Sequence, residues 1–242
     1  MDTQFYTVLS QYYDELFPNR QPPADFIHSL LPGPSTILDA GCATGNLSIS
    51  LARREHRVMG IDTDEHLLEQ ARHKTRPEGH NMMFRLLDMR KIGKVFGPGS
   101  YGCVACVGNT LPHLATAEEV RQFITDAHTI LAPGGWLVLQ LLNHDLIRHK
   151  GSLDLPVITT EHVIFKRQYV YDNGRILFHA RLERTVEADV LADAITHVCL
   201  TPAVLGGLIT GAGFTVTDRF AGPDRAAFTD DSQSLLVAAR RA

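Results

Sequence analysis

Ile37-Leu38-Asp39-Ala40-Gly41-Cys42-Ala43-Thr44-Gly45-Asn46 is the stretch of sequence that decides the fold. An apolar run ends in an acid, a turn containing two glycines follows, and a helix-like segment begins. In an open α/β sheet, a nucleotide-like ligand binds at such a turn, beyond the carboxyl end of the first strand. Gly41 and Gly45 let the backbone approach a ligand closely, because neither residue carries a Cβ atom. The stretch therefore predicts an α/β sheet with a ligand site at its carboxyl edge.

Around this turn, short apolar runs alternate with helix-like segments as far as about residue 145. Such alternation is typical of a parallel sheet covered by helices. The expected strands are Thr36–Ala40, Arg57–Asp62, Met82–Leu87, Gly102–Val107 and Trp136–Leu142. The expected helices are Asn46–Glu55, Glu65–Lys74 and Ala117–Leu131, the last of them ending at the breaker Ala132-Pro133-Gly134-Gly135.

The pattern changes between about residues 156 and 200, where polar and apolar residues alternate in long runs. Two of these runs, His162–Tyr171 and Arg175–Arg184, are joined by Asp172-Asn173-Gly174. An Asn-Gly turn between β-rich runs is a strong hairpin signal, so an antiparallel insertion is predicted here. After it, the sequence predicts a helix that opens at Thr201-Pro202 and two final strands, Phe214–Phe220 and Gln233–Ala239.

The predicted fold class is α/β, with a Rossmann-like, seven-stranded and mostly parallel sheet, helices on both faces, and the antiparallel insertion before the last two strands. Four segments are expected along the chain. They are a helical N-terminal lid at 1–34, a ligand-binding core at 35–145, the insertion at 146–200, and the last helix with the final two core strands at 201–242.

The composition argues against several classes of protein. With 44% hydrophobic and 21% charged residues, the 242-residue chain lies in the ordinary globular range. A net charge of −4 and a pI of about 6.3 disfavour a protein that grips a phosphate backbone, so no nucleic-acid partner is expected. No run approaches the roughly 18 apolar residues of a membrane span, and no secretory signal is recognisable. We therefore expect a cytoplasmic protein without a membrane partner.

The four cysteines, Cys42, Cys103, Cys106 and Cys199, are too scattered for a disulfide framework, which agrees with a reducing compartment. Only Cys103 and Cys106 have the spacing of a metal or redox pair. They lie in an apolar run that reads as a buried strand, where positions i and i+3 point to opposite faces. No paired zinc motif occurs among the twelve histidines either, so no metal site is expected.

Acids follow three successive predicted strands. Position 43 is alanine where a dinucleotide-binding G-x-G-x-x-G turn would need glycine. Asp39 would repel a pyrophosphate, but it would suit a cationic ligand that carries an ammonium and a sulfonium. Asp62 ends the next strand, where a carboxylate can accept hydrogen bonds from ribose hydroxyls. Asp88 and Met89 offer a carboxylate and an apolar side chain near an adenine. Asp62 or Asp88 alone could be a helix cap or a solvated acid, and only their succession at strand ends favours one ligand site.

These residues resemble the class I S-adenosylmethionine-dependent methyltransferases. The first motif of that family, D-x-G-x-x-x-G, matches Asp39, Gly41 and Gly45, and Leu131-Ala132-Pro133-Gly134-Gly135 is typical of the turn before its fifth strand. The resemblance covers about residues 35–142 and, more loosely, the last 40 or so. It implies that S-adenosylmethionine is the cofactor and S-adenosylhomocysteine its product. The implied cofactor-binding residues are Asp39, Gly41, Cys42, Ala43, Gly45, Asp62, Thr63, Asp88, Met89, Val107 and Tyr13.

The fourth predicted strand runs into Val107-Gly108-Asn109-Thr110-Leu111-Pro112-His113-Leu114, which is similar to the G-N-S-x-x-H-L segment of glycine N-methyltransferase-like small-molecule enzymes. Tyr12-Tyr13-Asp14 and Asn143-His144-Asp145 are further similarities to that group. The resemblance implies that Asn109 orients the acceptor or the cofactor. It implies for His113 either a catalytic base or a packing residue, with packing favoured.

One position departs from the glycine enzymes, in which an arginine directly before N-Y-D holds the substrate carboxylate. Here that position is Leu142, so glycine is doubtful as a substrate, although Arg148, Arg167 or Arg181 could serve a different anionic acceptor. The N-terminal aromatic residues fit an aromatic lid over the cofactor and a helix packed on the core equally well. They are Phe5, Tyr6, Tyr12, Tyr13 and Phe17.

The expected activity is therefore in-line transfer of a methyl group to a nitrogen or oxygen atom of a small-molecule acceptor, with specificity built by the insertion. Three alternatives stay open: a non-catalytic adenosylmethionine-binding protein, a methyltransferase acting on protein or RNA, and a nicotinamide-dependent oxidoreductase, which Asp39 and Ala43 disfavour. A homodimer also stays open.

Overall fold

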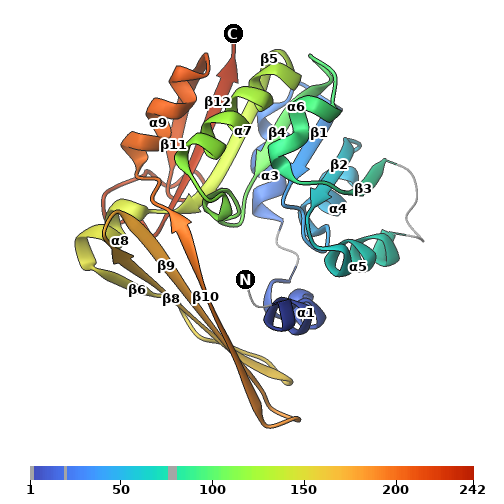
Figure 1. The fold of residues 1–242 in the computed structure, drawn as a ribbon. Helices are drawn as coiled ribbons and strands as arrows, with labels where there is room; N and C mark the ends of the chain where they lie inside the picture. The colour runs from blue at the N-terminus through green and yellow to red at the C-terminus, as the bar shows by residue number, and fades with distance from the viewer. Residues whose placement is uncertain (1–2, 19–20, 76–80) are drawn as a thin grey trace.

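A computed structural model describes residues 3–18, 21–75 and 81–242, and it contains two sheets (Figure 1). The strands of the larger sheet are β1 (Thr36–Ala40), β2 (Arg57–Asp62), β3 (Met82–Leu86), β4 (Tyr101–Cys106), β5 (Leu131–Leu142), β11 (Phe214–Phe220) and β12 (Ser234–Arg241). Their order is β11-β12-β5-β4-β1-β2-β3. β12 runs antiparallel to both of its neighbours, whereas β1 to β5 pair in parallel. The predicted Rossmann-like, seven-stranded, mostly parallel sheet is confirmed.

Helices cover both faces of this sheet (Figure 1). One face packs against α3 (Pro22–Leu30) and α4 (Asn46–Ala52), with α5 (Glu65–Thr75) beside β2 and β3. The other face packs against α6 (Ile92–Val95), α7 (Ala117–Ile130) and α9 (Pro202–Gly211). Both faces of the larger sheet are therefore covered by helices, as expected for a mostly parallel sheet.

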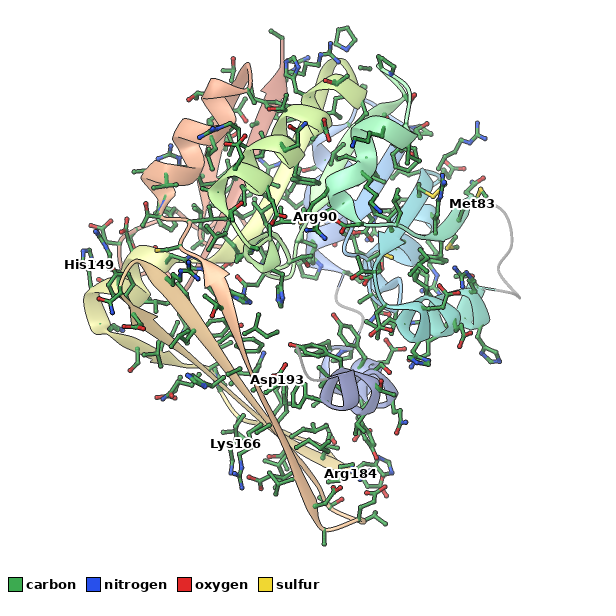
Figure 2. All side chains as sticks on the ribbon, viewed as in Figure 1. Met83, Arg90, His149, Lys166, Arg184 and Asp193 are labelled. Atoms are coloured by element: carbon green, nitrogen blue, oxygen red, sulfur yellow. The ribbon has the colours of Figure 1, made fainter. Side chains whose placement is uncertain are left out.

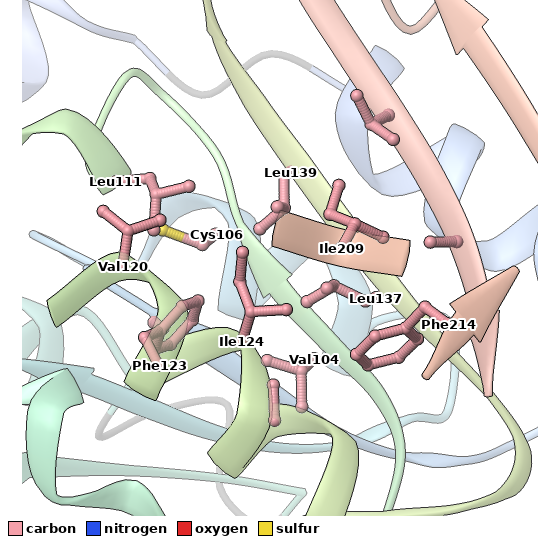
Figure 3. Packing of buried hydrophobic residues seen from close by; sticks show 14 of the residues in the cluster. Val104, Cys106, Leu111, Val120, Phe123, Ile124, Leu137, Leu139, Ile209 and Phe214 are labelled. Atoms are coloured by element: carbon pink, nitrogen blue, oxygen red, sulfur yellow. The ribbon is translucent and has the colours of Figure 1, made fainter. Parts of the chain in front are cut away.

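Helix α7 illustrates how the sequence directs this packing (Figure 3). Thr116 caps its first turn, accepting the backbone N–H of Glu119 at 3.2 Å, and two acids in that turn favour the positive end of the helix dipole. Its buried residues recur at helical spacing, and each large one contributes about 1.5–3 kcal/mol when removed from water. They are Val120, Phe123, Ile124, Ala127 and Ile130.

The insertion leaves the core after β5 and returns before α9. It contains α8 (His144–Lys150), β6 (Ser152–Asp154), β7 (Ile158–Thr159), β8 (Val163–Asp172), β9 (Arg175–Arg184) and β10 (Asp189–Val198). These strands form an antiparallel sheet in the order β10-β9-β8-β6, with β7 paired to β8. Asn173 and Gly174 have positive φ values of 46° and 84°, as the predicted hairpin turn requires.

The N-terminal helices α1 (Thr3–Gln11) and α2 (Tyr13–Leu16) lie between the insertion and α5 (Figure 1). Their apolar side chains join those of β8 and β9 in one cluster, which includes Phe5, Leu9, Leu16, Phe165 and Leu182. Residues 1–2 and 19–20 of the expected lid lie outside the described residues. We call α1 and α2 the lid below.

Two boundaries differ from the prediction by three residues or more. β5 begins at Leu131, so Ala132-Pro133-Gly134-Gly135 lies inside the strand rather than before it. The pairing with β4 jumps from Tyr101↔Leu131 to Cys103↔Trp136, because this Pro-Gly segment bulges out of the ladder. α4 ends at Ala52, three residues before the expected end, and the chain turns at Glu55 with a φ of 66°.

Cys103 and Cys106 pack on opposite faces of the larger sheet, as the strand prediction requires: Cys103 joins the cluster against α3 and α4, and Cys106 the cluster against α7. Among the described residues, no helix is both long and apolar enough to cross a membrane.

Candidate active site

The turn between β1 and α4, called the motif loop below, is held in a left-handed backbone conformation. Gly41 and Gly45 have φ values of 78° and Ala43 one of 47°. A Cβ atom on Gly45 would lie 2.6 Å from the Phe84 ring, and one on Gly41 would approach Thr110 still more closely. Besides any approach to a ligand, both glycines are therefore required by the backbone conformation and by packing against neighbouring strands.

Asp62, at the end of β2, fastens the motif loop to the sheet edge. Its Oδ2 accepts the backbone N–H of Ala43 at 2.9 Å, and its Oδ1 accepts those of Thr63 at 2.7 Å and Asp64 at 3.0 Å. Burial raises the pKa of Asp62, although these three hydrogen bonds oppose the shift. The carboxylate keeps lone pairs for a further donor, since an ionised carboxylate offers about four acceptor positions.

Asp39 lies directly beneath the motif loop and is only 1% exposed. Burial raises its pKa to about 6, the Ser48 hydroxyl opposes this by donating to Oδ2 at 2.7 Å, and the nearby Asp62 adds to the rise. Tyr13 of the lid faces the same pair: burial raises the pKa of its phenol, and Asp62, Asp14 and Asp39 raise it further. This corner therefore gathers negative charge that a cation would stabilise.

Asp88 reaches the same sheet edge but is already engaged. It caps the 3₁₀ helix η1 (Met89–Lys91), accepting the backbone N–H of Arg90 at 2.9 Å. The Arg90 side chain, labelled in Figure 2, also bonds Asp88 and pairs with Glu119 at 2.8 Å, and the Asp88–Arg90 bond lowers the pKa of Asp88. The helix-cap alternative is thus what the structure contains. Met89 is half-buried against the cluster around α7.

The lid contacts the motif loop through Asp14. Its Oδ1 accepts the Thr44 hydroxyl at 2.6 Å and the Asn46 amide at 3.0 Å, and Lys74 of α5 donates to Oδ2 at 2.8 Å. In the sequence, Asp14 stands out only through the family resemblance, and no role was predicted for Thr44, Asn46 or Lys74. These residues are up to 60 positions apart, and no local spacing reveals such a cluster.

Asn109 stands at the junction of core and insertion, two residues beyond the half-buried Val107. Its backbone is left-handed, with a φ of 65°. The side-chain Oδ1 accepts the backbone N–H of Leu142 at 2.9 Å, and Nδ2 donates to the Tyr169 hydroxyl of β8 at 3.4 Å. The amide therefore ties the end of β5 to the insertion sheet.

His113, which ends the 3₁₀ helix η2 (Leu111–His113), contacts the insertion through His197 of β10, their ring centroids being 4.3 Å apart. His113 keeps solvent exposure, and desolvation by the surrounding protein lowers its pKa to about 4. His197 is 1% exposed and also stacks on Phe178, at 5.5 Å. His197 was not predicted as a site residue, since one histidine on an alternating strand gives no signal.

The remaining predicted site residues surround the motif loop. Cys42 and Ala43 are buried within it, and Thr63 is exposed just after β2. A hollow of about 680 Å³ lies elsewhere, on the insertion, lined by Lys166, His179 and Arg181 among others. None of the carboxylates beside the motif loop lines that hollow, so the candidate site and the hollow are separate.

Residues 37–135 match a protein family described as "Methyltransferase domain". The chain is 30% identical over 142 residues to a ubiquinone biosynthesis O-methyltransferase of Chromobacterium violaceum, covering 58% of this chain and 57% of that protein. It is 29% identical over 119 residues to a glycine/sarcosine N-methyltransferase of Halorhodospira halochloris, covering 49% and 44%. The chain thus spans about half the length of the curated relatives that it matches.

Two solved structures share the fold across nearly the whole chain. The CcbJ methyltransferase from Streptomyces caelestis superposes with a TM-score of 0.83 at 22% identity, covering 97% of this chain and 96% of that one. CalS10, an amino pentose methyltransferase from Micromonospora echinaspora solved with S-adenosylmethionine bound, has a TM-score of 0.68 at 19% identity, covering 100% and 98%. Together with the strand order, these likenesses show that the chain has the fold of these methyltransferases, and residues 37–135 match the methyltransferase-domain family.

Proposed function

We propose that this protein uses S-adenosylmethionine to methylate a nitrogen or oxygen atom of a small-molecule acceptor. The observation that carries the proposal is the pair of largely buried carboxylates, Asp39 and Asp62, at the motif loop. Burial raises the pKa of both, which means that each ionised carboxylate is unfavourably placed without a nearby cation. A ligand bearing an ammonium and a sulfonium fits this donor set, whereas a pyrophosphate would be repelled.

The residues at the sheet edge have distinct proposed roles toward this cofactor. Asp39 and the backbone of Gly41 to Gly45 hold the methionine end, and Asp62 with Thr63 binds the ribose. Asp88 and Met89 flank the adenine, for which the Asp88 carboxylate has to share its acceptor positions with Arg90. Val107 and Tyr13 enclose the site from β4 and from the lid. When bound, S-adenosylmethionine supplies an electrophilic methyl group on a positively charged sulfur.

The protein's own contribution is mainly alignment. Holding two reactants in a reactive geometry is worth roughly 7–11 kcal/mol in well-oriented systems. Asn109 fixes the relative position of core and insertion, and His113 and Tyr169 lie on the side of the acceptor. His113 is neutral near pH 7, since its pKa is lowered to about 4, so it can accept a hydrogen bond from an amine or hydroxyl. The name of the neighbour CalS10, an amino pentose methyltransferase, supports a small-molecule amine as acceptor.

Calorimetric titration of the purified protein with S-adenosylmethionine and S-adenosylhomocysteine tests this function, with reduced nicotinamide cofactors as the comparison. We expect micromolar binding of the first pair alone. Asp62→Ala should weaken it at least about tenfold, a loss of roughly 1.4 kcal/mol. The proposal fails if the wild type binds neither adenosyl compound, and the ribose assignment fails if Asp62→Ala binds normally.

We also propose that the protein forms a homodimer and is located in the cytoplasm. For a homodimer, exposed apolar side chains of the insertion such as Val157, at 53%, and Val190, at 49%, would offer contact surface. Light scattering would measure its mass, and a monomer at all concentrations would reject it. The four free cysteines support a cytoplasmic location, which cell fractionation would test.

A further inference from the structure

The most densely hydrogen-bonded carboxylate of the lid belongs to Asp14. Lys74 donates to both of its oxygens, at 3.0 and 2.8 Å, while Thr44 and Asn46 donate to Oδ1. Lys74 also donates to the Asn46 side-chain oxygen at 2.9 Å. One hydrogen-bond network therefore joins three segments of the chain. They are the lid, the motif loop with the start of α4, and α5.

Further hydrogen bonds join the lid to α4 and α5. The Asn46 amide donates to the backbone oxygen of Phe17, just past α2, at 3.0 Å. Asn46 therefore bonds the lid through both its Asp14 carboxylate and its main chain. Nearby, the Gln70 side chain of α5 donates to the Ser10 carbonyl of α1 at 2.7 Å. The lid is fixed to the cofactor side of the molecule by directional bonds, and not only by apolar packing on the insertion.

The adjacent acid, Glu15, points the other way. Its carboxylate lies 3.0 Å from Nδ1 of His162, at the start of β8 in the insertion. Neighbouring acids on one short helix thus bond two different parts of the protein. Of these two acids, Asp14 is the one that bonds residues of the motif loop and of the helix that starts from it.

We propose that Asp14 and Lys74 form a latch that sets the affinity of the cofactor site, by holding Tyr13 and the motif loop in one arrangement. The inference rests on the proposed function for the identity of the ligand. Asp14 is in this sense a positioning residue: it acts through Thr44, which follows Ala43 in the left-handed part of the loop, and through Tyr13, whose phenol faces Asp39 and Asp62.

The physical reason is preorganisation. A loop and a lid that are ordered before binding leave less conformational entropy to be lost when the ligand arrives. Hydrogen bonds to ionised groups are stronger than neutral ones, so the Asp14 carboxylate holds Thr44 and Asn46 better than a neutral amide would. The side chains of Lys74 and Asp14 are 28% and 41% exposed, so part of the ion pair is screened by solvent and salt.

The first experiment compares three variants by calorimetric titration with S-adenosylhomocysteine. Asp14→Asn should bind about tenfold more weakly than the wild type, because both the ion pair and the charged acceptor are lost. Lys74→Met should bind about threefold more weakly, because Thr44 and Asn46 still bond Asp14. Glu15→Gln is the matched control, changing an acid on the same helix that bonds the insertion, and its affinity should stay within about twofold.

A double variant tests whether the two residues act together. If they form one latch, Asp14→Asn with Lys74→Met should bind no more weakly than Asp14→Asn alone. Additive losses would overturn the pairing. Equal affinity of Asp14→Asn and wild type would overturn the latch altogether, as would a loss in Glu15→Gln as large as that in Asp14→Asn.

Hydrogen exchange without any ligand separates this inference from the proposed function. Amides of residues 5–17 and 43–46 should exchange faster in Asp14→Asn than in wild type or Glu15→Gln, with the β4 and β5 amides unchanged. If wild type binds no S-adenosylhomocysteine but this difference appears, the proposed function fails and the latch stands. Unchanged exchange in the lid would reject the latch, whatever ligand the protein binds. Faster exchange throughout the sheet would reject it too, since global destabilisation would then explain any lost affinity.

Discussion

The two sheets of this protein are stabilised in different ways. In the core, β1 and β4 are buried along almost their whole length and are covered by helices on both faces. In the insertion, β9 buries every second residue, and the residues between them, apart from Leu177, are charged or polar. The first arrangement fixes a sheet edge from several sides, whereas the second leaves one face unconstrained.

This difference separates two functional tasks. The motif loop is held by backbone conformation and by backbone hydrogen bonds to Asp62, so its shape tolerates little change. The wall that we propose on the side of the acceptor consists of side chains on β8 and β10, such as Tyr169 and His197, and these can vary without altering the ladder. Substitutions should therefore cost most in the motif loop, less in the buried part of the insertion, and least at the bonds that join the two.

The largest effect is expected for Gly45→Val. The position has a φ of 78°, and its Cβ would lie 2.6 Å from Phe84 and 3.2 Å from Ala71. Backbone strain and overpacking each cost about 1–3 kcal/mol, so we expect a loss of about 3–5 kcal/mol in the free energy of unfolding, measured in urea. Gly99→Ala is the control: its φ is 68° but nothing lies within 4 Å, so strain alone should cost about 1 kcal/mol. Equal losses would contradict the role of packing.

The sequence predicted the core in detail because its signals are local. A buried strand is a short apolar run, and strand-end acids such as Asp39 and Asp62 stand beside the turn that they support. β1 and β2 were predicted with their observed bounds. β5 was predicted to start too late, because Pro133 and Gly134 signal a break, yet the bulge lets the strand resume its ladder.

The site outside the motif loop was harder to predict, because its contacts join distant residues. The bond of Asp14 to Lys74 spans 60 positions, and the contact of His113 with His197 links η2 to a strand of the insertion. Asp88 shows a further limit: its position was predicted, but Arg90, two residues later, occupies its carboxylate. The sequence indicates at which end of which strand a side chain lies. Which residue it bonds depends on tertiary packing.

Lowering the pH should reduce the free energy of unfolding by an intermediate amount, mainly through two histidines of the insertion. Burial lowers the pKa of His144 to about 4 and that of His197 to about 2, both from 6.5. As the pH falls below 6.5, the unfolded chain binds protons first, so stability present above that pH is lost. By pH 5.5 each histidine should cost about 1.4 kcal/mol relative to pH 8.

Asp39 opposes this loss. Its pKa is raised from 3.8 to about 6, so below pH 6 the folded chain binds this proton first and recovers about 0.8 kcal/mol by pH 5.5. We therefore expect His144, His197 and Asp39 together to contribute a net loss of about 2 kcal/mol between pH 8 and 5.5, measured by urea denaturation, and the lowered pKa of His113 acts in the same direction. His197→Phe keeps a ring beside Phe178 and removes one titrating group, so its loss should be smaller than that of the wild type by about 1.4 kcal/mol. An unchanged pH dependence in that variant would contradict the assignment to His197.

The smallest effects are expected where Asn109 joins the two regions. Asn109→Gly keeps a residue that accepts a φ of 65°, so it removes only the 2.9 Å bond to Leu142 and the 3.4 Å bond to Tyr169. It should cost about 1 kcal/mol in urea denaturation, mainly through the shorter bond. Tyr169→Phe removes only the longer one and should cost less than about 0.5 kcal/mol, because a hydrogen bond weakens with length. If Tyr169→Phe costs as much as Asn109→Gly, the bond to the insertion outweighs the bond within the core. The sheet edge that holds the motif loop would then depend on the insertion for its position, and the separation of the two tasks would not hold.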